Sequence, residues 1–405
     1  MRRLVLCAGL AAGLLPSSVG AQSLPLTEAD ALARLSPSSP RVRAIRAGID
    51  VARADVLAAG RWPNPRLTYD RESVAGVTEN ITTIAQALPI SGRLRLQVRA
   101  ASALVDAAAN RADDDLRRAR ADLRIAFAQL AAAQAREQEL GRARDRLREL
   151  AGVLARREAA GDAAGFDRLR AEREVLDVET DRAAAAADRV RAQATLAGFF
   201  AEAIEPDRIV AMDVITPRPD LPPVDALLER AESVRGELLA LRKEIGAARF
   251  SEQAARRRLV PDPEIVAGSK SSNVGRDIGS VVMVQATIPL FDRARPERAQ
   301  AQARAHEAEA RAEALRIVLR ADIAALRASV IQQRETATRY RAAAASGDQI
   351  ERIAQVSYDA GERGILEVLD AYRTGASARV RQAVLDGAVR QAEIELEFAS
   401  GWEIR

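Results

Sequence analysis

The sequence has almost no cysteine, histidine or lysine and few aromatic residues, and these shortages exclude several classes of protein. Its one cysteine, Cys7, cannot form a disulfide within the chain, and its one histidine, His306, cannot form the two-histidine motif of a zinc enzyme. The 61 basic and 57 acidic residues give a formal net charge of +4, which is too balanced for a nucleic-acid-binding surface. After the first 21 residues no apolar run is long enough for a transmembrane helix, so a membrane-spanning part would have to consist of strands.

Residues 1–21 have the pattern of a secretory signal peptide. Two arginines precede the apolar run 4–15, and small residues before Gln22 fit a cleavage site. Cys7 lies early in this run and follows a leucine, where an acylated cysteine would need a small residue. We therefore expect an exported mature chain that begins at Gln22, without a lipid anchor and without cysteine.

The rest of the chain is rich in alanine and charged residues and contains 3% aromatic residues, which is typical of long helices packed through small side chains. Steps of seven residues from Val98 to Leu154 meet only apolar residues, and similar rows follow Ala305 and Ile323. Heptads sustained over this length predict coiled-coil packing.

A tandem repeat organises the mature chain. The segment "WPNPRLTY" at residue 62 matches "VPDPEIVA" at 260, and "QALPI" at 86 matches "QATIPL" at 285. The repeats span 22–203 and 224–405, and the proline-rich segment 204–223 between them is interpreted as a linker.

Each repeat has the same expected order: a short helix, a strand hairpin, a long helix and a medium helix. The expected ranges are 41–61, 64–89, 93–157 and 166–200 in the first repeat, and 235–259, 263–289, 295–358 and 365–398 in the second. The strand-like runs are 66–73 with 80–88, and 264–270 with 277–288. Apolar and polar residues alternate in the last run, as in a transmembrane strand, but also as in a half-buried soluble strand.

Helix lengths indicate how the repeats assemble. A long helix of ~64 residues measures ~95 Å, and a medium helix of ~50 Å with a short one of ~35 Å roughly covers it. Four strands cannot close a membrane barrel, and an open sheet would leave unpaired edges in lipid. If the strands are in a membrane, the chain must therefore oligomerise, and three copies would supply twelve strands.

The repeat, the hairpin starts "PNP" and "PDP", the joints "QALPISGR" and "QATIPLFDRAR", and the stretch from Tyr358 to Ala371 resemble the TolC family of outer-membrane efflux proteins. The resemblance covers essentially the whole mature chain. The "NP" hairpin start and "LPISGR" are most similar to the heavy-metal-efflux branch. Many members of that branch are lipoproteins, and the chain also lacks a cluster of methionine, cysteine or histidine.

The resemblance implies a mainly α-helical fold with a small β part. A homotrimer would form a 12-stranded outer-membrane β-barrel, continued by an α-helical barrel across the periplasm, with an equatorial belt built from the linker and terminal segments. Pro89 and Pro289 would be the joints between strand and helix, since proline ends a strand ladder and suits a change of direction. The implied partners are outer-membrane lipid, a periplasmic adaptor (membrane fusion protein) and an inner-membrane exporter, so the chain would be the exit duct of a tripartite efflux pump for metal cations or drugs in a Gram-negative bacterium.

The resemblance also implies a gate at the periplasmic mouth, in the turns that end the long helices. Glu367 and Asp370 match the acidic residues that ring the closed mouth in the family. Tyr358 and Arg363 match a latch that ties to an acidic residue of the first turn, for which Asp167 is the match. The rest of the first turn is a poor match, and solvated helix-end residues are the alternative interpretation.

Two other functions stay open at this point. The same fold serves as the outer-membrane channel of type I protein secretion, and a periplasmic coiled-coil adaptor shares helical hairpins, although not the duplication. An enzyme is not expected, because the chain has no phosphate-binding glycine loop and no nucleophile elbow. No cofactor and no metal site are expected; the run "DDD" at 113–115 could bind a cation but equally fits a hydrated helix face.

Overall fold

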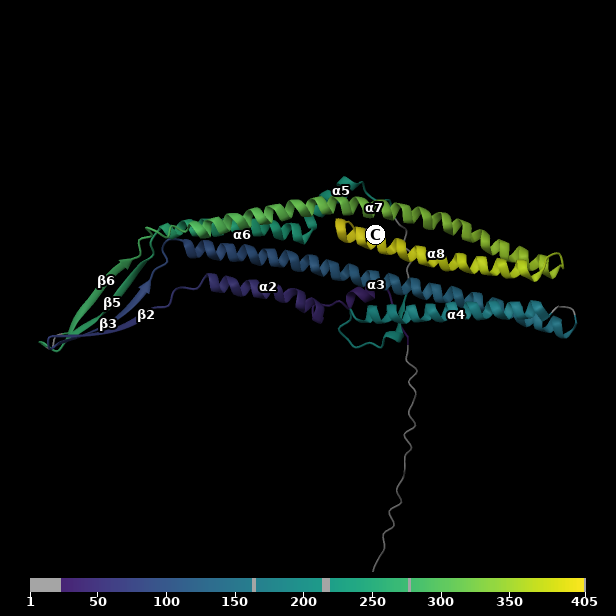
Figure 1. The fold of residues 1–405 in the computed structure, drawn as a ribbon, viewed down its shortest axis with the longest axis horizontal. Helices are drawn as coiled ribbons and strands as arrows, with labels where there is room; N and C mark the ends of the chain where they lie inside the picture. The colour runs from purple at the N-terminus through teal and green to yellow at the C-terminus, as the bar shows by residue number, and fades with distance from the viewer. Residues whose placement is uncertain (1–22, 162–164, 213–218, 276–277, 404–405) are drawn as a thin grey trace, which may run out of the picture.

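A computed structural model describes residues 23–161, 165–212, 219–275 and 278–403 (Figure 1). The molecule is elongated, with long helices side by side and a four-stranded sheet at one end. The fold is mainly helical with a small sheet, as the sequence predicted. The signal-peptide prediction for residues 1–21, with Cys7, falls outside the described residues.

Four helices form most of the length. The two long ones are α3 (Arg93–Ala159) and α7 (Arg295–Asp359), and each begins at the residue expected from the sequence. The two medium ones are α4 (Gly165–Ala197) and α8 (Ile365–Ser400). Each medium helix returns along the long helix that precedes it, so each repeat contains one helical hairpin.

Two shorter helices complete the columns. Helix α2 (Pro40–Ala59) packs on α3 and lies in line with α4, and α6 (Gly236–Arg256) packs on α3 and α7 and lies in line with α8 (Figure 1). The order across the molecule is therefore α2 with α4, then α3, then α6 with α8, then α7. The α2–α4 column and α7 are the two outer columns, and each has one side without a neighbouring helix column.

The heptad rows explain how the helices pack. In the row from Val98 to Leu154 every residue is buried or half-buried, and in α7 Ala312, Leu319, Ile323 and Val330 are buried. Many of the buried residues are alanines, which allow neighbouring helices to lie close together. At the end of the bundle away from the sheet, which we call the tip, one apolar cluster joins Leu147, Leu150 and Leu154 of α3 with residues of α4, α7 and α8.

The sheet consists of β2 (Arg66–Val74), β3 (Val77–Ala87), β5 (Pro263–Ser272) and β6 (Ile278–Ala286), in the order β2-β3-β5-β6, and all neighbours are antiparallel. Each repeat supplies one hairpin, and β3 and β5 join the two hairpins. The strands have 9, 11, 10 and 9 residues, which is the length that crosses a bilayer when tilted.

Small elements cluster about midway along the helices. Strand β1 (Leu24–Leu26) pairs in parallel with β4 (Ile209–Ala211), and the short α1 (Glu28–Ala33) lies beside them. The remaining elements are α5 (Val224–Val234) and two 3-10 turns, η1 (Pro206–Arg208) and η2 (Arg257–Leu259).

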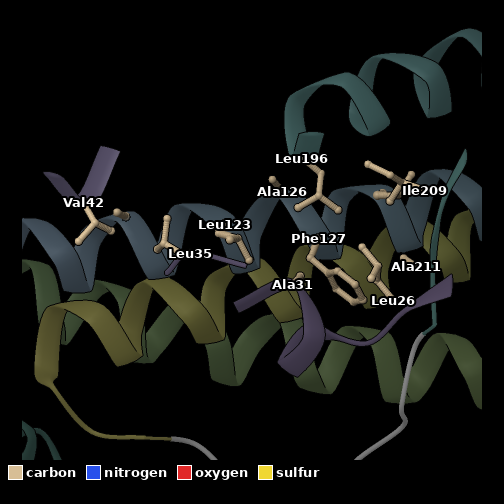
Figure 2. Close-up of a cluster of buried hydrophobic side chains, with 12 residues drawn as sticks. Leu26, Ala31, Leu35, Val42, Leu123, Ala126, Phe127, Leu196, Ile209 and Ala211 are labelled. Atoms are coloured by element: carbon tan, nitrogen blue, oxygen red, sulfur yellow. The ribbon is translucent and has the colours of Figure 1, made fainter. Parts of the chain in front are cut away.

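The pairing of β4 with β1 joins the linker segment 204–223 to the N-terminal segment, the two parts of the chain to which the resemblance assigned an equatorial belt. Figure 2 shows that Ile209, Leu26 and Leu196 pack together against Phe127 of α3, and the side chain of Ile209 is fully buried. Part of the segment is therefore a folded layer that covers one side of α3; residues 213–218 fall outside the described residues.

Candidate functional site

The two faces of the sheet differ in chemistry. One face is apolar and exposed: Ile278, Val282 and Val284 of β6 are 70–80% exposed, as are Leu67 by 71% and Tyr69 by 61% in β2. The cross-strand register places these residues on one side together with Ile84, Ile265, Ala267 and Ala286. Among the described positions of this face, Arg71 is the one charged residue. We call this side the apolar face, although uncharged polar residues share it, among them Ser73, Asn80, Thr82, Gln86, Ser269, Ser271 and Ser280. A soluble protein rarely exposes so many large apolar side chains on one side of a sheet.

The opposite face is polar, with its charged residues at the strand positions in between. It bears Arg66, Asp70, Glu72, Glu79, Glu264 and Lys270. Arg66 pairs with Glu264 at 3.1 Å, and Lys270 pairs with Glu79 at 2.6 Å. A sheet with one uncovered apolar face and one charged face matches the wall of a water-filled barrel in a membrane.

The two strand-to-helix joints have the same local geometry. At each proline the next residue's N–H bonds to the carbonyl oxygen two residues back, Ile90 to Leu88 at 2.8 Å and Leu290 to Ile288 at 3.0 Å. This tight turn changes the chain direction without continuing the strand ladder. Pro89 and Pro289 thus lie where the chain turns from the sheet into α3 and α7.

A left-handed residue follows each joint and begins the helix. Gly92 has φ 75° and Ala294 has φ 53°, and the Ala294 side chain is fully buried. A non-glycine residue in this conformation is uncommon. Its N–H donates to Asp292 Oδ1 at 3.2 Å, which holds the turn.

At the other end of the molecule, both long helices end in the same way. Gly161 and Gly361 have φ +84° and +73°, and their N–H groups donate to Glu158 and Tyr358 carbonyl oxygens at 2.9 and 3.0 Å. Left-handed glycine is the usual end of a helix. The two turns lie near each other at the tip of the bundle (Figure 1); residues 162–164 of the first turn fall outside the described residues.

The predicted latch residues all lie at this tip but are not joined within the described part of one chain. Asp167 lies in the first turn of α4, Tyr358 in the last turn of α7, and Arg363 is exposed in the turn between α7 and α8. Another arginine contacts the tyrosine: Arg157 of α3 stacks on the Tyr358 ring at 5.1 Å and lies 3.6 Å from Asp359. No sequence pattern indicated this contact, because it joins two helix ends about 200 residues apart in the chain.

Glu367 and Asp370 lie on the exposed side of the first turns of α8. Asp370 is 3.4 Å from Arg373, and both side chains are more than two-thirds exposed, so this pair is weak. On the opposite side of the same turns, Ile365, Val368 and Leu369 are buried in the apolar cluster at the tip. The packing of these residues therefore fixes the orientation of both carboxylates away from the protein interior.

A buried ion-pair network lies just inside the tip and was not predicted. The Glu351 carboxylate of α7, whose side chain is 6% exposed, accepts hydrogen bonds from Arg146 of α3 and from Arg379 of α8 at 2.8 Å. Burial, and then the charge of Glu351, raise the pKa of the nearby Tyr372. This network links the two repeats. We name it the Glu351 network.

Two features singled out in the sequence, the "DDD" run at 113–115 and His306, belong to no described group of side chains that could hold a metal ion. In the "DDD" run, Asp114 is buried and accepts hydrogen bonds from Arg235 at 3.1 Å and from the Gly236 N–H at 3.1 Å. The hydrated-face interpretation is therefore wrong for this residue, whereas Asp113 and Asp115 are exposed. His306 is 82% exposed and lies 3.5 Å from Glu309.

Across the described ranges, no three histidine, cysteine or acidic side chains are grouped so that they could hold a metal ion. The described helices include none that is both long and apolar enough to cross a membrane.

Comparisons with known proteins agree with this geometry. The family model "Outer membrane efflux protein" matches residues 227–402. The cobalt-zinc-cadmium resistance protein CzcC of Cupriavidus metallidurans is 26% identical over 424 residues, which cover 99% of this chain and all of that protein.

Solved structures share the fold over nearly the whole length. A membrane protein from Pseudomonas aeruginosa superposes with a TM-score of 0.77 at 20% identity and covers 92% of this chain and 93% of that one. The outer membrane protein VceC from Vibrio cholerae gives a TM-score of 0.74 at 18% identity, with 93% and 97% covered. The chain is therefore similar to outer membrane efflux proteins in sequence and in fold, and its predicted resemblance to the TolC family of outer-membrane efflux proteins is confirmed.

Proposed function

We propose that three copies of the chain form the exit duct of a tripartite efflux pump. The observation that carries this proposal is the exposed apolar face of a sheet with two open edges. In lipid, each unpaired backbone group at an edge would cost several kcal/mol. Closing four strands from each of three copies into one barrel of twelve removes every edge.

The outer columns of one chain provide complementary surfaces for a neighbouring copy. Strand β2 is one edge of the sheet and follows α2, whereas β6 is the other edge and precedes α7. The α2–α4 column and β2 thus lie at one side of the chain, and α7 and β6 at the other. Such a head-to-tail contact closes into a ring when the rotation permits.

Exposed apolar residues support the same contact along the helices. In α4, Leu169, Leu176 and Val190 belong to one heptad row and are half or more exposed. In α7, Ile350, Ile353 and Val356 are exposed by 51–68%. Packing the α7 row of one copy against the α4 row of the next would bury both.

In this assembly the apolar face meets outer-membrane lipid, and the polar face lines the pore. The helices continue the pore into the periplasm, where the tip would meet a periplasmic adaptor and an inner-membrane exporter. The similarity to a cobalt-zinc-cadmium resistance protein supports metal cations as the substrate class, with drugs as the second class.

We further propose that the tip is the gate. Two carboxylates from each of three copies, Glu367 and Asp370, would form a ring of six that attracts cations. Because these groups repel each other, other contacts must hold the mouth closed. We assign that role to Arg363 and Tyr358 of one copy with Asp167 of the next, which agrees with the exposure of Arg363 and its lack of an ion pair with any described residue of its own chain.

Single-channel recording in planar bilayers tests this function. The wild-type protein should conduct at a low level, and the double variant Arg363→Ser with Tyr358→Phe should conduct more. A charge-assisted bond of the latch contributes about 1.5–3 kcal/mol if it is partly buried, so the open state should gain about 10- to 150-fold in population. If no channels form, the duct proposal is wrong.

A second double variant tests the ring. Glu367→Ala with Asp370→Ala should weaken block by multivalent cations added from the periplasmic side. The matched control replaces two exposed carboxylates far from the tip, Asp55→Ala with Glu313→Ala, and should leave the block unchanged. Equal block in both double variants would show that the ring is not at the constriction.

A further inference from the structure

Positive charge is concentrated where the sheet joins the helices. Four segments meet there, residues 56–66, 86–100, 250–264 and 286–300, and we call them the joint girdle. They contain eleven arginines and five carboxylates, a net charge of +6, although the whole chain has a net charge of only +4. The remainder of the chain is therefore slightly negative, and the girdle is its main basic region.

The acidic residues of the girdle are already engaged. Glu264 pairs with Arg66, and Glu252 pairs with Arg256. The other three carboxylates are also used: Asp292 and Glu297 pair with Arg258, and Asp262 accepts from the Ser91 N–H at 2.9 Å.

Five arginine side chains of the girdle are exposed and form neither an ion pair nor a hydrogen bond with any residue in the described ranges. They are Arg61, Arg95, Arg99, Arg257 and Arg295. An exposed cluster of one sign that lacks internal partners is suited to a ligand of opposite charge.

The girdle lies directly beyond the end of the apolar face. The strands β2 and β5 begin there, and β3 and β6 end there. Two aromatic side chains are exposed at the same level, Phe291 by 99% and Trp62 by 59%. Apolar surface, then aromatic residues, then arginines is the order in which a protein passes from the hydrocarbon layer to the phosphate layer of a membrane.

Arg95 and Arg99 also lie on the outer side of the helices. They are four residues apart and therefore share one face of α3. Steps of seven from Arg95 reach Leu116 and Leu123, which pack under the β1–β4 layer. Because that layer would obstruct a pore if it lay inside, this face of α3 points outward.

We propose that the five unpaired arginines of the joint girdle bind the phosphates of anionic phospholipids in the periplasmic leaflet of the outer membrane. Guanidinium groups bind phosphate through paired N–H donors. The proposal rests on the proposed function, since it requires the sheet to span the membrane. Its role is to fix the depth of the sheet in the bilayer.

Lipid binding to the purified full-length protein tests this proposal. The protein in a neutral detergent is titrated with a fluorescent phosphatidylglycerol and, separately, with the matching phosphatidylcholine. The wild-type protein should bind phosphatidylglycerol at least about tenfold more tightly than phosphatidylcholine. In the triple variant Arg61→Gln, Arg95→Gln, Arg99→Gln, each lost arginine should weaken phosphatidylglycerol binding by about fivefold, so the preference should disappear.

The matched control is the triple variant Arg316→Gln, Arg320→Gln, Arg381→Gln, which removes three exposed arginines of α7 and α8 that form no ion pair with a described residue. This variant should keep the preference for phosphatidylglycerol. A triple Arg→Lys variant of the girdle positions should keep most of it, because lysine retains the charge. Equal affinity of the wild-type protein for both lipids, or an unchanged preference in the Gln triple variant, would overturn the proposal.

Two further arms identify the source of any failure. Inorganic phosphate at millimolar concentration should not displace phosphatidylglycerol; full displacement would show a site for free phosphate and overturn the lipid assignment. Channel formation by the same preparation is measured in parallel. Channels without lipid preference would refute only the girdle proposal, whereas the absence of channels would refute the proposed function on which it rests.

Discussion

Replacing Glu351 by glutamine should loosen the tip of the bundle. In the Glu351 network the carboxylate joins arginines of α3 and α8, and Gly375 of α8 provides the space for it. A Cβ at this glycine would lie 1.8 Å from Glu351 Oε1, so Gly375→Ala should expel the carboxylate and have a similar effect. Both substitutions leave the helices' apolar cluster intact.

The magnitude follows from burial. Removing one partner of a fully buried ion pair costs about 3–5 kcal/mol. Here the Glu351 side chain is 6% exposed, but Arg146 is 46% and Arg379 20% exposed, so water can partly solvate the arginines left behind. Glutamine also retains hydrogen bonding, so we expect a loss of about 2 kcal/mol. That loss corresponds to about a 30-fold larger equilibrium population of the locally open state.

Hydrogen–deuterium exchange measures this opening. Amides at the end of α7 and the start of α8 should exchange about 30-fold faster in Glu351→Gln, while amides near the sheet should not change. The control is Glu335→Gln, which removes an exposed pair with Arg339 and should change exchange by less than about twofold. If Glu351→Gln and Gly375→Ala exchange at the tip like this control, the reasoning about the network is refuted.

Three further predictions concern other parts of the chain. Gly236→Ala should destabilise the protein by about 3 kcal/mol or more in chemical unfolding, because its Cβ would lie 2.0 Å from the Asn110 carbonyl oxygen, whereas Gly246→Ala, which meets no atom within 4 Å, should not destabilise it. Burial tends to raise the pKa of Glu28, but the hydrogen bond from Arg390 and nearby arginine charges outweigh burial and lower it. The resulting stability is present above about pH 4.5 and is lost as pH falls through the lower folded-state pKa; the melting temperature should fall more between pH 5 and 3 in wild type than in Glu28→Gln, and equal falls would contradict the assignment. Val282→Arg on the apolar face should cost about 2–4 kcal/mol in a bilayer and reduce recovery from the outer membrane, while Val281→Arg on the polar face should have little effect.

The sequence contained enough information for the long elements and too little for the short ones. The heptads fixed α3 and α7, and the left-handed Gly161 and Gly361 mark where they end. Strands β1 and β4 have three residues each, which is too short for any alternation to be recognised, so their pairing was missed. Their position depends on Ile209 and Phe127, which are far apart in the chain and meet only in the folded protein.

Charged residues were the least predictable part of the site. Asp114 belongs to an acidic run that suggests a hydrated surface, but Arg235 from the second repeat lies against it. Glu351 has no distinguishing sequence pattern, and its role depends on the space at Gly375. The latch of Asp167, Tyr358 and Arg363 stays a prediction, since its contacts would form between copies.

Of the alternative functions, a periplasmic adaptor does not fit the match to the outer membrane efflux family over residues 227–402. Type I protein secretion uses the same fold and stays open as the alternative function. The neighbouring genes would distinguish the two: a proton-driven exporter with an adaptor indicates efflux, and an ABC exporter with a toxin indicates secretion.

The mass of the detergent-purified particle tests the central claim most directly. Light scattering, corrected for bound detergent, should give three protomers per particle. Each chain supplies one four-stranded sheet, so the proposed barrel of twelve strands needs three chains. A stable, folded monomer with its sheet edges open would contradict the account.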